Sequence, residues 1–385
     1  MNSIQTPPYI PAGNGQRVVV AMSGGVDSSV AALLLQQAGY EVIGVTMRLF
    51  NAPTNEAARL NRSCCSLEDV ADARAVCRVI GARHHFLNFE REFKKHVIDY
   101  FVDEYSKGRT PYPCLACNDR LKFDFLLERA AVLDAEMIAT GHYAQIDTAA
   151  HPHQLLRGVD PGKDQSYVLY TLGQNQLNKL LLPVGGYQKS EIRQIARDGG
   201  LAVADKPDSQ DICFIPDGDY RDFVMPRIEE PRPGKLVGPD GETLREHDGI
   251  HNFTIGQRKG LGLPGGGGKP LFVSEIDAES GTVWLGPAAA LLRSELIASK
   301  VNWIDGATPD SPIRGLARIR YKAPDVPATI TSTGSGATVV FDEPQRAVTP
   351  GQAVVFFDGD RVLGGGTIEL PVRNAQPEPA SVAIA

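Results

Sequence analysis

Hydrophobic residues along residues 17–201 fall into short apolar runs that alternate with longer amphipathic stretches. The runs at 17–22 (RVVVAM), 40–49 (YEVIGVTMRL) and 84–89 (HHFLNF) are rich in β-branched and aromatic residues and predict strands. Between the first two, residues 28–39 (SSVAALLLQQAG) have helical spacing and end at a glycine, which is typical of a helix C-cap. This alternation predicts an α/β domain over residues 17–206, with a parallel sheet covered by helices on both faces.

The pattern changes after Lys206. Glycine and proline become frequent, and short alternating runs such as ARIRYK (317–322) and AVVFFD (353–358) replace the helical stretches. We therefore expect a small β-rich linking domain over residues 207–294 and a C-terminal β-barrel over residues 295–371. The polar ends, residues 1–16 and 372–385, are expected to be a disordered arm and tail.

Composition narrows the class of protein. The chain has 385 residues and a net charge of −7, which argues against nonspecific coating of nucleic acid. It contains no apolar run of 18 residues and no apolar stretch typical of a secretory signal near residue 1, so we expect a cytoplasmic protein without a membrane partner. Its six cysteines are then expected to be reduced thiols, with Cys77 at helical spacing in a core and the adjacent Cys64 and Cys65 unsuited to sharing a metal.

The candidate chemistry begins at a glycine loop, residues 21–29 (AMSGGVDSS), placed between a predicted strand and a predicted helix. The loop lacks the lysine of a Walker A motif and the G-x-G-x-x-G spacing of a dinucleotide fold. Backbone N–H groups, serine hydroxyls and a helix N-terminus can still bind a pyrophosphate group, and Asp27 could hold Mg²⁺. The S-G-G-x-D-S pattern resembles the signature of the ATP-pyrophosphatase (PP-loop) families, which cleave ATP between its α- and β-phosphates and adenylate a substrate oxygen.

Two cysteines are candidates for the group that attacks after activation. Cys117 follows a proline-rich stretch, and with Asn118 as an N-cap it would lie at a helix N-terminus, where the macrodipole lowers the pKa of a thiol. Cys213 lies in a second polar, turn-rich stretch, DSQDICFIPDGDY (208–220). A cysteine in such a polar loop is less often a buried core residue than a cysteine at helical spacing such as Cys77.

The motifs together resemble those of tRNA-specific 2-thiouridylase, in order from about Arg17 to Ile368. The blocks that carry this resemblance are AMSGGVDSSVAA, CCSLEDVADAR, GRTPYPCLACNDRLKF, ATGHYA, KDQSYVL, PDSQDICFIP, FTIGQRKGLG, ARIRYK and VTPGQAVVFFDGD. The family converts the wobble-position uridine of certain tRNAs to 2-thiouridine.

The resemblance implies a role for each matching residue. It implies that Cys117 is the nucleophile, that Cys213 carries the incoming sulfur as a persulfide, and that a persulfide-delivering protein is a partner besides tRNA. ATP would be bound by Ala21, Met22, Ser23, Gly24, Gly25, Val26, Asp27, Ser28, Met47 and Gly141. The target base would be lined by Tyr112, Pro113 and Cys114, and tRNA would be contacted by His142, Lys163, Asp164, Gln165, Arg320, Tyr321 and Gln352.

Thiolation of uridine is consistent with a phosphate-binding loop and two candidate thiols in one chain. The C2 carbonyl of uracil is a poor electrophile, and adenylation of its oxygen makes AMP a leaving group. The terminal sulfur on Cys213 then attacks C2 directly, or Cys117 attacks the persulfide and releases sulfide, leaving a Cys117–Cys213 disulfide. The sequence does not distinguish the two routes.

Cys114 departs from the family pattern, in which many members have an aspartate. Cys114 either fills that space or joins Cys117 and Cys213 as ligands of a [4Fe–4S] cluster with one open iron. A structural zinc is less consistent with the sequence because no fourth ligand is evident.

Local basic residues suggest where RNA binds. Arg318, Arg320 and Lys322 alternate, so on a strand they would form one basic face opposite Ile319 and Tyr321. A second, weaker basic feature is the pair Lys189 and Arg193, one helical turn apart. His142 and Tyr143 are candidates either for stacking on a base turned out of the anticodon or for ordinary packing at a strand end.

Three other classes of protein remain open at this point. Another PP-loop synthetase, forming an amide or lysidine, would stay active when Cys117 or Cys213 is replaced. A redox protein using Cys114 and Cys117 would not depend on Asp27, and a noncatalytic tRNA-binding protein would release no pyrophosphate.

Overall fold

The structure, a computed structural model, describes residues 10–50, 67–208, 212–215, 219–263 and 269–370. Cys64, Cys65, the first nine residues of the predicted arm and the predicted tail 372–385 lie outside the described residues. Residues 10–16 do not behave as a disordered arm. Ile10 is buried in the core, and the backbone N–H groups of Gly13 and Gly15 donate to Ala38 and Gly39, so the chain is ordered before the first strand.

The N-terminal domain is built on a five-stranded sheet in the order β3-β2-β1-β4-β7. Its pairings are all parallel, as the alternating pattern predicts. The central strand β1 contains the fully buried run Val18–Val20, which explains its continuous hydrophobic sequence. The strands are β1 (Arg17–Ala21), β2 (Glu41–Arg48), β3 (Arg83–Asn88), β4 (Met137–Ala139) and β7 (Leu180–Leu181).

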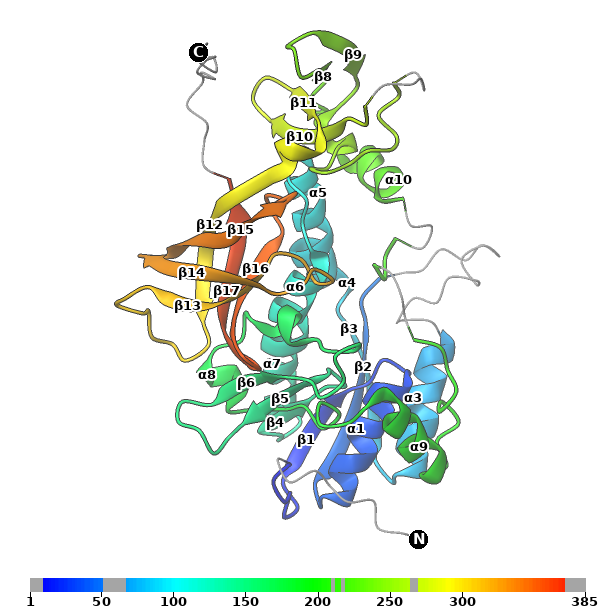
Figure 1. The fold of residues 1–385 in the computed structure, drawn as a ribbon. Helices are drawn as coiled ribbons and strands as arrows, with labels where there is room; N and C mark the ends of the chain where they lie inside the picture. Colours follow the sequence, from blue (N-terminus) through cyan, green and yellow to red (C-terminus); the bar gives the residue numbers. More distant parts are fainter. Residues whose placement is uncertain (1–9, 51–66, 209–211, 216–218, 264–268, 371–385) are drawn as a thin grey trace.

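Helices cover both faces of this sheet (Figure 1). Each face has its own hydrophobic core. One core is formed by α1 (Val26–Gln37), α3 (Leu67–Val79) and α9 (Lys189–Asp198) against the sheet. The other is formed by two longer helical runs. These are α4 (Glu90–Phe93), η1 (Lys94–Ile98) and α5 (Asp99–Ser106), and α6 (Pro113–Ala116), η2 (Cys117–Phe125) and α7 (Leu126–Val132).

The second of these runs corrects the expected position of Cys117. The helix begins at Pro113, with Tyr112 as N-cap, and Cys117 opens the π-helical segment η2 inside the continuous run. Asn118 is not an N-cap, because it is buried and its Nδ2 donates to the carbonyl of Val168. The macrodipole acts mainly within the first turn. The argument that a helix N-terminus activates Cys117 is therefore not supported.

The middle of the chain forms a four-stranded sheet in the order β10-β11-β8-β9. It is preceded by the short helix α10 (Tyr220–Val224), and Leu236, Val273 and Val283 lie fully buried in its core. The strands are β8 (Gly234–Val237), β9 (Thr243–His247), β10 (Phe272–Asp277) and β11 (Thr282–Gly286).

The C-terminal part is a closed antiparallel barrel, as predicted. Six strands follow the order β12-β15-β14-β13-β16-β17, and a pairing between β12 and β17 closes the ring. They are β12 (Leu292–Trp303), β13 (Ile313–Arg318), β14 (Val326–Thr333), β15 (Gly336–Arg346), β16 (Ala353–Asp358) and β17 (Arg361–Glu369).

The barrel sheet is extended by a hairpin from the N-terminal domain. Strands β5 (Ala144–Asp147) and β6 (Gln154–Arg157) pair with each other, and β6 pairs with β17. The two domains therefore share one continuous sheet (Figure 1). None of the helices in the described ranges is long and apolar enough to cross a bilayer.

Candidate active site

The glycine loop leaves β1 and enters α1, as the sequence predicts. Gly25 is the N-cap of α1 and has no side chain to cap the helix, so the first N–H groups of the helix are left for a ligand. The Ser28 hydroxyl donates to the Gly25 carbonyl at 3.2 Å, and its oxygen accepts from the backbone N–H of Ser23 at 3.2 Å. These bonds hold the turn in a shape suited to a phosphate group.

Two glycines set how closely other segments approach this loop. Gly24 has φ +73°, and a Cβ there would lie 2.3 Å from the carbonyl oxygen of Asp69 in α3. A Cβ on Gly141, after β4, would lie 2.6 Å from the backbone nitrogen of Ser28. The end of β4, where the predicted ATP-binding residue Gly141 lies, therefore packs directly on the start of α1.

Asp27 is held by groups outside the loop. Lys189 Nζ lies 2.7 and 2.8 Å from its two carboxylate oxygens, and the Tyr143 hydroxyl donates to Oδ1 at 2.7 Å. Lys189 also bridges to Asp208, which accepts from Lys163 and Arg193 as well. Burial alone would raise the pKa of Asp208, but the hydrogen bonds from Lys163 and Lys189 hold it below its usual value.

This network corrects the second predicted basic feature. Lys189 and Arg193 do not form an RNA-facing surface, because both are paired within the protein. Asp208 lies five residues before Cys213, so the same network fixes the start of the segment that carries this thiol. Phe214, on the other side of Cys213, packs edge-on against Phe93 and Phe101.

The segment that leads to Cys117 is held by the C-terminal barrel. Gln352 Nε2 donates to the carbonyls of Thr110 and Pro111 at 2.9 and 3.4 Å. A Cβ on Gly351, which has φ +89°, would lie within 3.1 Å of the Thr110 backbone. Tyr112 stacks on Tyr321 with ring centroids 6.2 Å apart. Gln352 and Tyr321, predicted to contact tRNA, therefore lie against the segment that carries the target-base residues.

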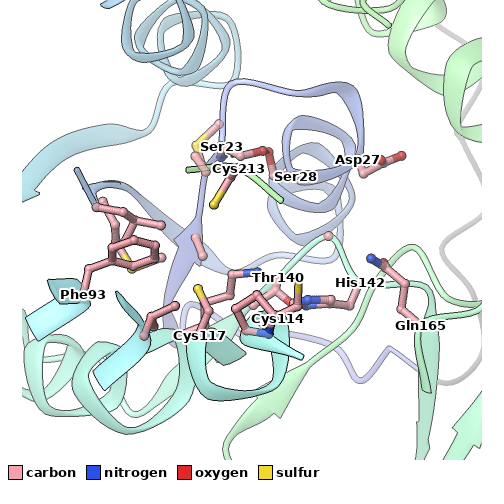
Figure 2. Close-up of a pocket in the computed structure, with 18 of the residues that line it drawn as sticks. Ser23, Asp27, Ser28, Phe93, Cys114, Cys117, Thr140, His142, Gln165 and Cys213 are labelled. Atoms are coloured by element: carbon pink, nitrogen blue, oxygen red, sulfur yellow. Dashed lines mark hydrogen bonds between the residues drawn. The ribbon is translucent and has the colours of Figure 1, made fainter. Parts of the chain in front are cut away.

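One cavity of about 340 Å³ joins the loop to the thiols. Figure 2 shows Cys213 on the side of Ser23 and Ser28, and Cys114 and Cys117 on the facing wall. Cys117 is buried, Cys213 is half-buried and Cys114 is exposed. Of the residues predicted from sequence, the cavity is lined by Ala21, Met22, Ser23, Asp27, Ser28, Met47, Pro113, Cys114, Cys117, Gly141, His142, Gln165 and Cys213.

His142 is a buried, neutral residue that lines this cavity. Its Nδ1 lies 2.7 Å from the Thr140 hydroxyl, and burial, followed by the charge of Lys122, lowers its pKa well below the usual value. Tyr143 is buried as well, and its hydroxyl is committed to Asp27. Gln165 accepts from the backbone N–H of Tyr143 at 3.0 Å, which fixes its position beside His142.

The predicted basic face on ARIRYK is wrong. Strand β13 ends at Arg318, so residues 319–322 do not continue the alternation. Arg318 is directed inward, where its guanidinium pairs with Asp325 at 2.7 Å and lies 3.5 Å from the buried Asp164. Asp164 also accepts from the backbone N–H groups of Gly158 and Ser166, so its carboxylate has a structural role. Arg320 remains exposed.

Sequence reasoning missed two lysines of the site. Lys189 was assigned to a surface, although it forms an ion pair with Asp27 of the glycine loop. Lys122 was not considered, although it lines the cavity five residues after Cys117. The spacing of Lys122 from Cys117 becomes informative only when η2 is known to be a π-helix.

The cluster hypothesis for the three cysteines is not supported by their geometry. They line one cavity, but within the described ranges no group of three or more His, Cys, Asp or Glu side chains is placed to hold a metal ion. The donors are chemically suitable for iron and sulfide, yet their arrangement here does not fit a cluster.

Comparison with protein families covers most of the chain. Residues 16–217 match the tRNA methyl transferase HUP domain, residues 221–287 the tRNA methyl transferase PRC-barrel domain, and residues 293–368 the aminomethyltransferase beta-barrel domain.

Curated relatives match over more than nine-tenths of this chain. The tRNA-specific 2-thiouridylase MnmA 1 of Thermoanaerobacter sp. (strain X514) is 50% identical over 93% of this chain and 99% of its own. The enzyme named tRNA-specific 2-thiouridylase MnmA in Clostridioides difficile (strain 630) is 48% identical over 92% and 98%. Solved structures match less well. A 4-thiouridine synthetase–RNA complex with bound ATP is 19% identical with a TM-score of 0.34, over 54% of this chain and 47% of that chain.

Proposed function

The chain belongs to the tRNA-specific 2-thiouridylases, which are tRNA sulfurtransferases, and we propose that it uses ATP to replace the C2 oxygen of the wobble-position uridine of tRNA with sulfur. The observation that supports this most directly is the single cavity that joins the phosphate-binding loop to Cys117 and Cys213. An amide- or lysidine-forming synthetase needs no such pair of thiols beside the loop. A redox protein needs no such loop.

The first step takes place at the loop. The N–H groups at the start of α1, with the hydroxyls of Ser23 and Ser28, bind the phosphates of ATP. Asp27 is the carboxylate of the cavity and would hold the Mg²⁺ that accompanies ATP, in exchange for its ion pair with Lys189. Met47 and Gly141 border the adenosine, and the uracil lies toward Pro113 and Cys114.

The second step is thiolate chemistry between the facing walls. A persulfide on Cys213, loaded by a sulfur donor protein, places its terminal sulfur in the cavity that Cys117 shares. If the terminal sulfur attacks C2, AMP leaves and Cys117 then attacks Cys213 Sγ to release 2-thiouridine. If Cys117 attacks first, the released sulfide attacks C2. Both routes end in a Cys117–Cys213 disulfide, which a thiol reductant must reopen.

The test is to incubate the protein with ATP, Mg²⁺, a persulfide donor, a thiol reductant and unmodified tRNA, and to map the tRNA by mass spectrometry. We expect oxygen-to-sulfur exchange at the wobble uridine, with one AMP and one pyrophosphate per sulfur. Folded, ATP-binding protein that leaves the tRNA mass unchanged would contradict the proposal.

Cysteine variants assign the thiols. Cys117→Ser and Cys213→Ser are each expected to abolish thiolation while keeping tRNA-dependent pyrophosphate release. Cys77→Ala is the matched control: Cys77 is buried behind Met22, with its Sγ 3.3 Å from the Met22 sulfur, it does not itself line the cavity, and burial raises the pKa of its thiol to about 11. With Cys117→Ser, covalent attachment of tRNA to Cys213 through the transferred sulfur indicates direct attack by the persulfide, whereas a persulfide that stays on Cys213, with neither attached tRNA nor released sulfide, indicates the second route, because only Cys117 releases sulfide there.

A further inference from the structure

Lys122 is the one cationic side chain among the described residues that line the cavity. Asp27 carries the other formal charge, and His142 is neutral because burial and Lys122 itself lower its pKa. A cavity that binds a nucleotide triphosphate needs positive charge. The glycine loop, however, contains no lysine or arginine.

The position of Lys122 is fixed by its neighbours on η2. Leu121 and Phe123, on either side of it, are both fully buried, and Asn118 ties the segment to Val168. A π-helix has more residues per turn than an α-helix, so residues five apart lie close to the same face. Lys122 therefore shares the cavity-facing side of η2 with Cys117.

Its ammonium group has no partner in the part of the chain that the structure describes: no hydrogen bond or ion pair joins it to another residue. Lys189, in contrast, is paired with both Asp27 and Asp208. A half-buried lysine without a partner decreases stability, so retaining one inside a cavity requires a compensating function.

The geometry between the walls indicates which anion Lys122 meets. In the proposed function the β- and γ-phosphates would lie at Ser23 and Ser28 and the uracil toward Cys117, on facing walls of the cavity, so the α-phosphorus would lie between them. Lys122 is beside Cys117 along η2 and beside His142, whose neighbour Gly141 packs on Ser28. It is thus close to the middle of the cavity.

We propose that Lys122 binds the α-phosphate of ATP and stabilises the charge that develops there during adenylation and on the departing AMP. This inference rests on the proposed function. In the step concerned, the uracil O2 forms a bond to the α-phosphorus while the bond from that phosphorus to the β-phosphate oxygen breaks. Pyrophosphate leaves with the electron pair of the broken bond, and the N3 proton passes to solvent.

The test compares Lys122→Met, which keeps the length of the side chain and removes its charge, with Lys122→Arg. For Lys122→Met we expect tRNA-dependent pyrophosphate release to fall by about 100-fold or more, since loss of one preorganised donor typically has that effect. Binding of ATP alone should weaken less than about tenfold, because the loop is intact. Lys122→Arg should release pyrophosphate at least about tenfold faster than Lys122→Met, because it keeps the positive charge.

The matched control is Lys95→Met. Lys95 lies on the other π-helical segment, η1, and is exposed. It is expected to release pyrophosphate at the wild-type rate. Urea unfolding separates a role in binding from a structural role, because removal of an unpartnered charge should leave Lys122→Met at least as stable as the wild type.

Three results would overturn the inference. The first is Lys122→Met releasing pyrophosphate within threefold of the wild-type rate. The second is slower pyrophosphate release by Lys122→Met together with a lower free energy of unfolding than the wild type, which would make the role of Lys122 structural. The third is normal pyrophosphate release with slower alkylation of Cys117, which would assign the cation to the thiolate. If the wild-type protein itself released no pyrophosphate with tRNA, the proposed function would be wrong, and this inference with it.

Discussion

The charge of Asp27 is balanced by a side chain that is far away in the sequence. Its carboxylate is about one-third exposed, while the Lys189 side chain is only 12% exposed. Two charge-assisted hydrogen bonds in such a place are stronger than an exposed ion pair. Lys189 thus stabilises the loop, and Mg²⁺ with ATP would have to replace it at Asp27.

We predict that Lys189→Met destabilises the nucleotide-free protein by about 1–3 kcal/mol, because Asp27 and Asp208 both lose a cation. Asp27→Asn in the same chain should recover part of this loss, since Asp27 loses its cation whereas Asp208 keeps Lys163 and Arg193. Urea denaturation of the four proteins in the double-mutant cycle measures the coupling. Strict additivity of the two substitutions would contradict the predicted interaction.

The buried His142 makes a prediction about pH. Its folded-state pKa lies well below 6.5, whereas in the unfolded chain it titrates near 6.5, so below that pH only the unfolded state gains its proton. His142 therefore reduces stability as pH falls below about 6.5, with a slope of up to about 1.4 kcal/mol per pH unit. His142→Gln should show a shallower decline between pH 6.5 and 5 in urea unfolding. Equal slopes of stability against pH for the two proteins would exclude this role. The pKa values of His84, His247 and His251 are also lowered, so these residues account for the loss of stability that remains in His142→Gln at low pH.

Where β4 meets α1, the packing leaves no space for a side chain on Gly141. Gly141→Ala places a methyl group 2.6 Å from the Ser28 nitrogen and 2.7 Å from the Asp27 carbonyl carbon, so the end of β4 and the loop must separate. We expect a loss of about 1–3 kcal/mol in stability and weaker ATP binding, measured by urea unfolding and equilibrium dialysis. Gly162→Ala is the matched control, because its only close neighbour is the Asp160 carboxylate oxygen at 3.3 Å and its φ is not positive. An unchanged affinity of Gly141→Ala for ATP would contradict the assigned site.

The secondary structure of the N-terminal domain could be predicted from sequence for strands such as β1 and β2, because they are continuous hydrophobic runs. The start of the helix at Pro113 could not, because the prediction relied on Asn118 as a cap and overlooked that proline suits the first helical position. The π-helical winding of η2 has no local signal in its sequence. It is stabilised by tertiary contacts such as the Asn118 bond to Val168.

The site as a whole could be predicted only in part. The loop and both thiols were identified from their motifs, and they do line one cavity. The basic face at Arg318 was wrong because the charges that neutralise it, Asp164 and Asp325, are supplied by other segments. A pattern along one strand cannot show which distant carboxylates will lie against it.

The N-terminal domain and the barrel are tied together next to the catalytic segment. Arg109 donates through both terminal nitrogens to Glu369 on β17, and its Nε lies 2.7 Å from Glu104 on α5. The three side chains are only 13–32% exposed. The residue after Arg109 is Thr110, where Gln352 attaches the barrel, so this cluster positions the chain that leads to Cys117.

We predict that Arg109→Leu lowers the free energy of unfolding by about 2–3 kcal/mol, because two partly buried carboxylates lose their cation. Arg314→Leu is the matched control: Arg314 makes a bidentate pair with Asp342 whose side chains are 61% and 45% exposed, so solvent screens the pair and its loss should change stability much less than Arg109→Leu does. Urea unfolding at pH 7 measures both.

The same pair gives a pH signature. Burial would raise the pKa of Glu369, but the hydrogen bonds from Arg109 and Ser299 lower it, so its contribution is present above the usual glutamate pKa and is lost as pH falls through the lowered value. The difference between wild type and Arg109→Leu should therefore shrink as pH falls below about 4.3. A constant difference down to pH 3 would show that the Arg109 contribution is not electrostatic.

The sheet shared by the hairpin β5–β6 and strand β17 has a consequence for synthesis on the ribosome. Leu156 pairs with Arg361, which is translated about 200 residues later, or roughly 10–40 s at ordinary elongation rates. During that interval the nascent N-terminal domain displays the outer edge of β6 without its neighbour, and such an edge is open to pairing with other chains. Chaperone demand should therefore be concentrated in this interval, and chains truncated before β17 should aggregate through β6.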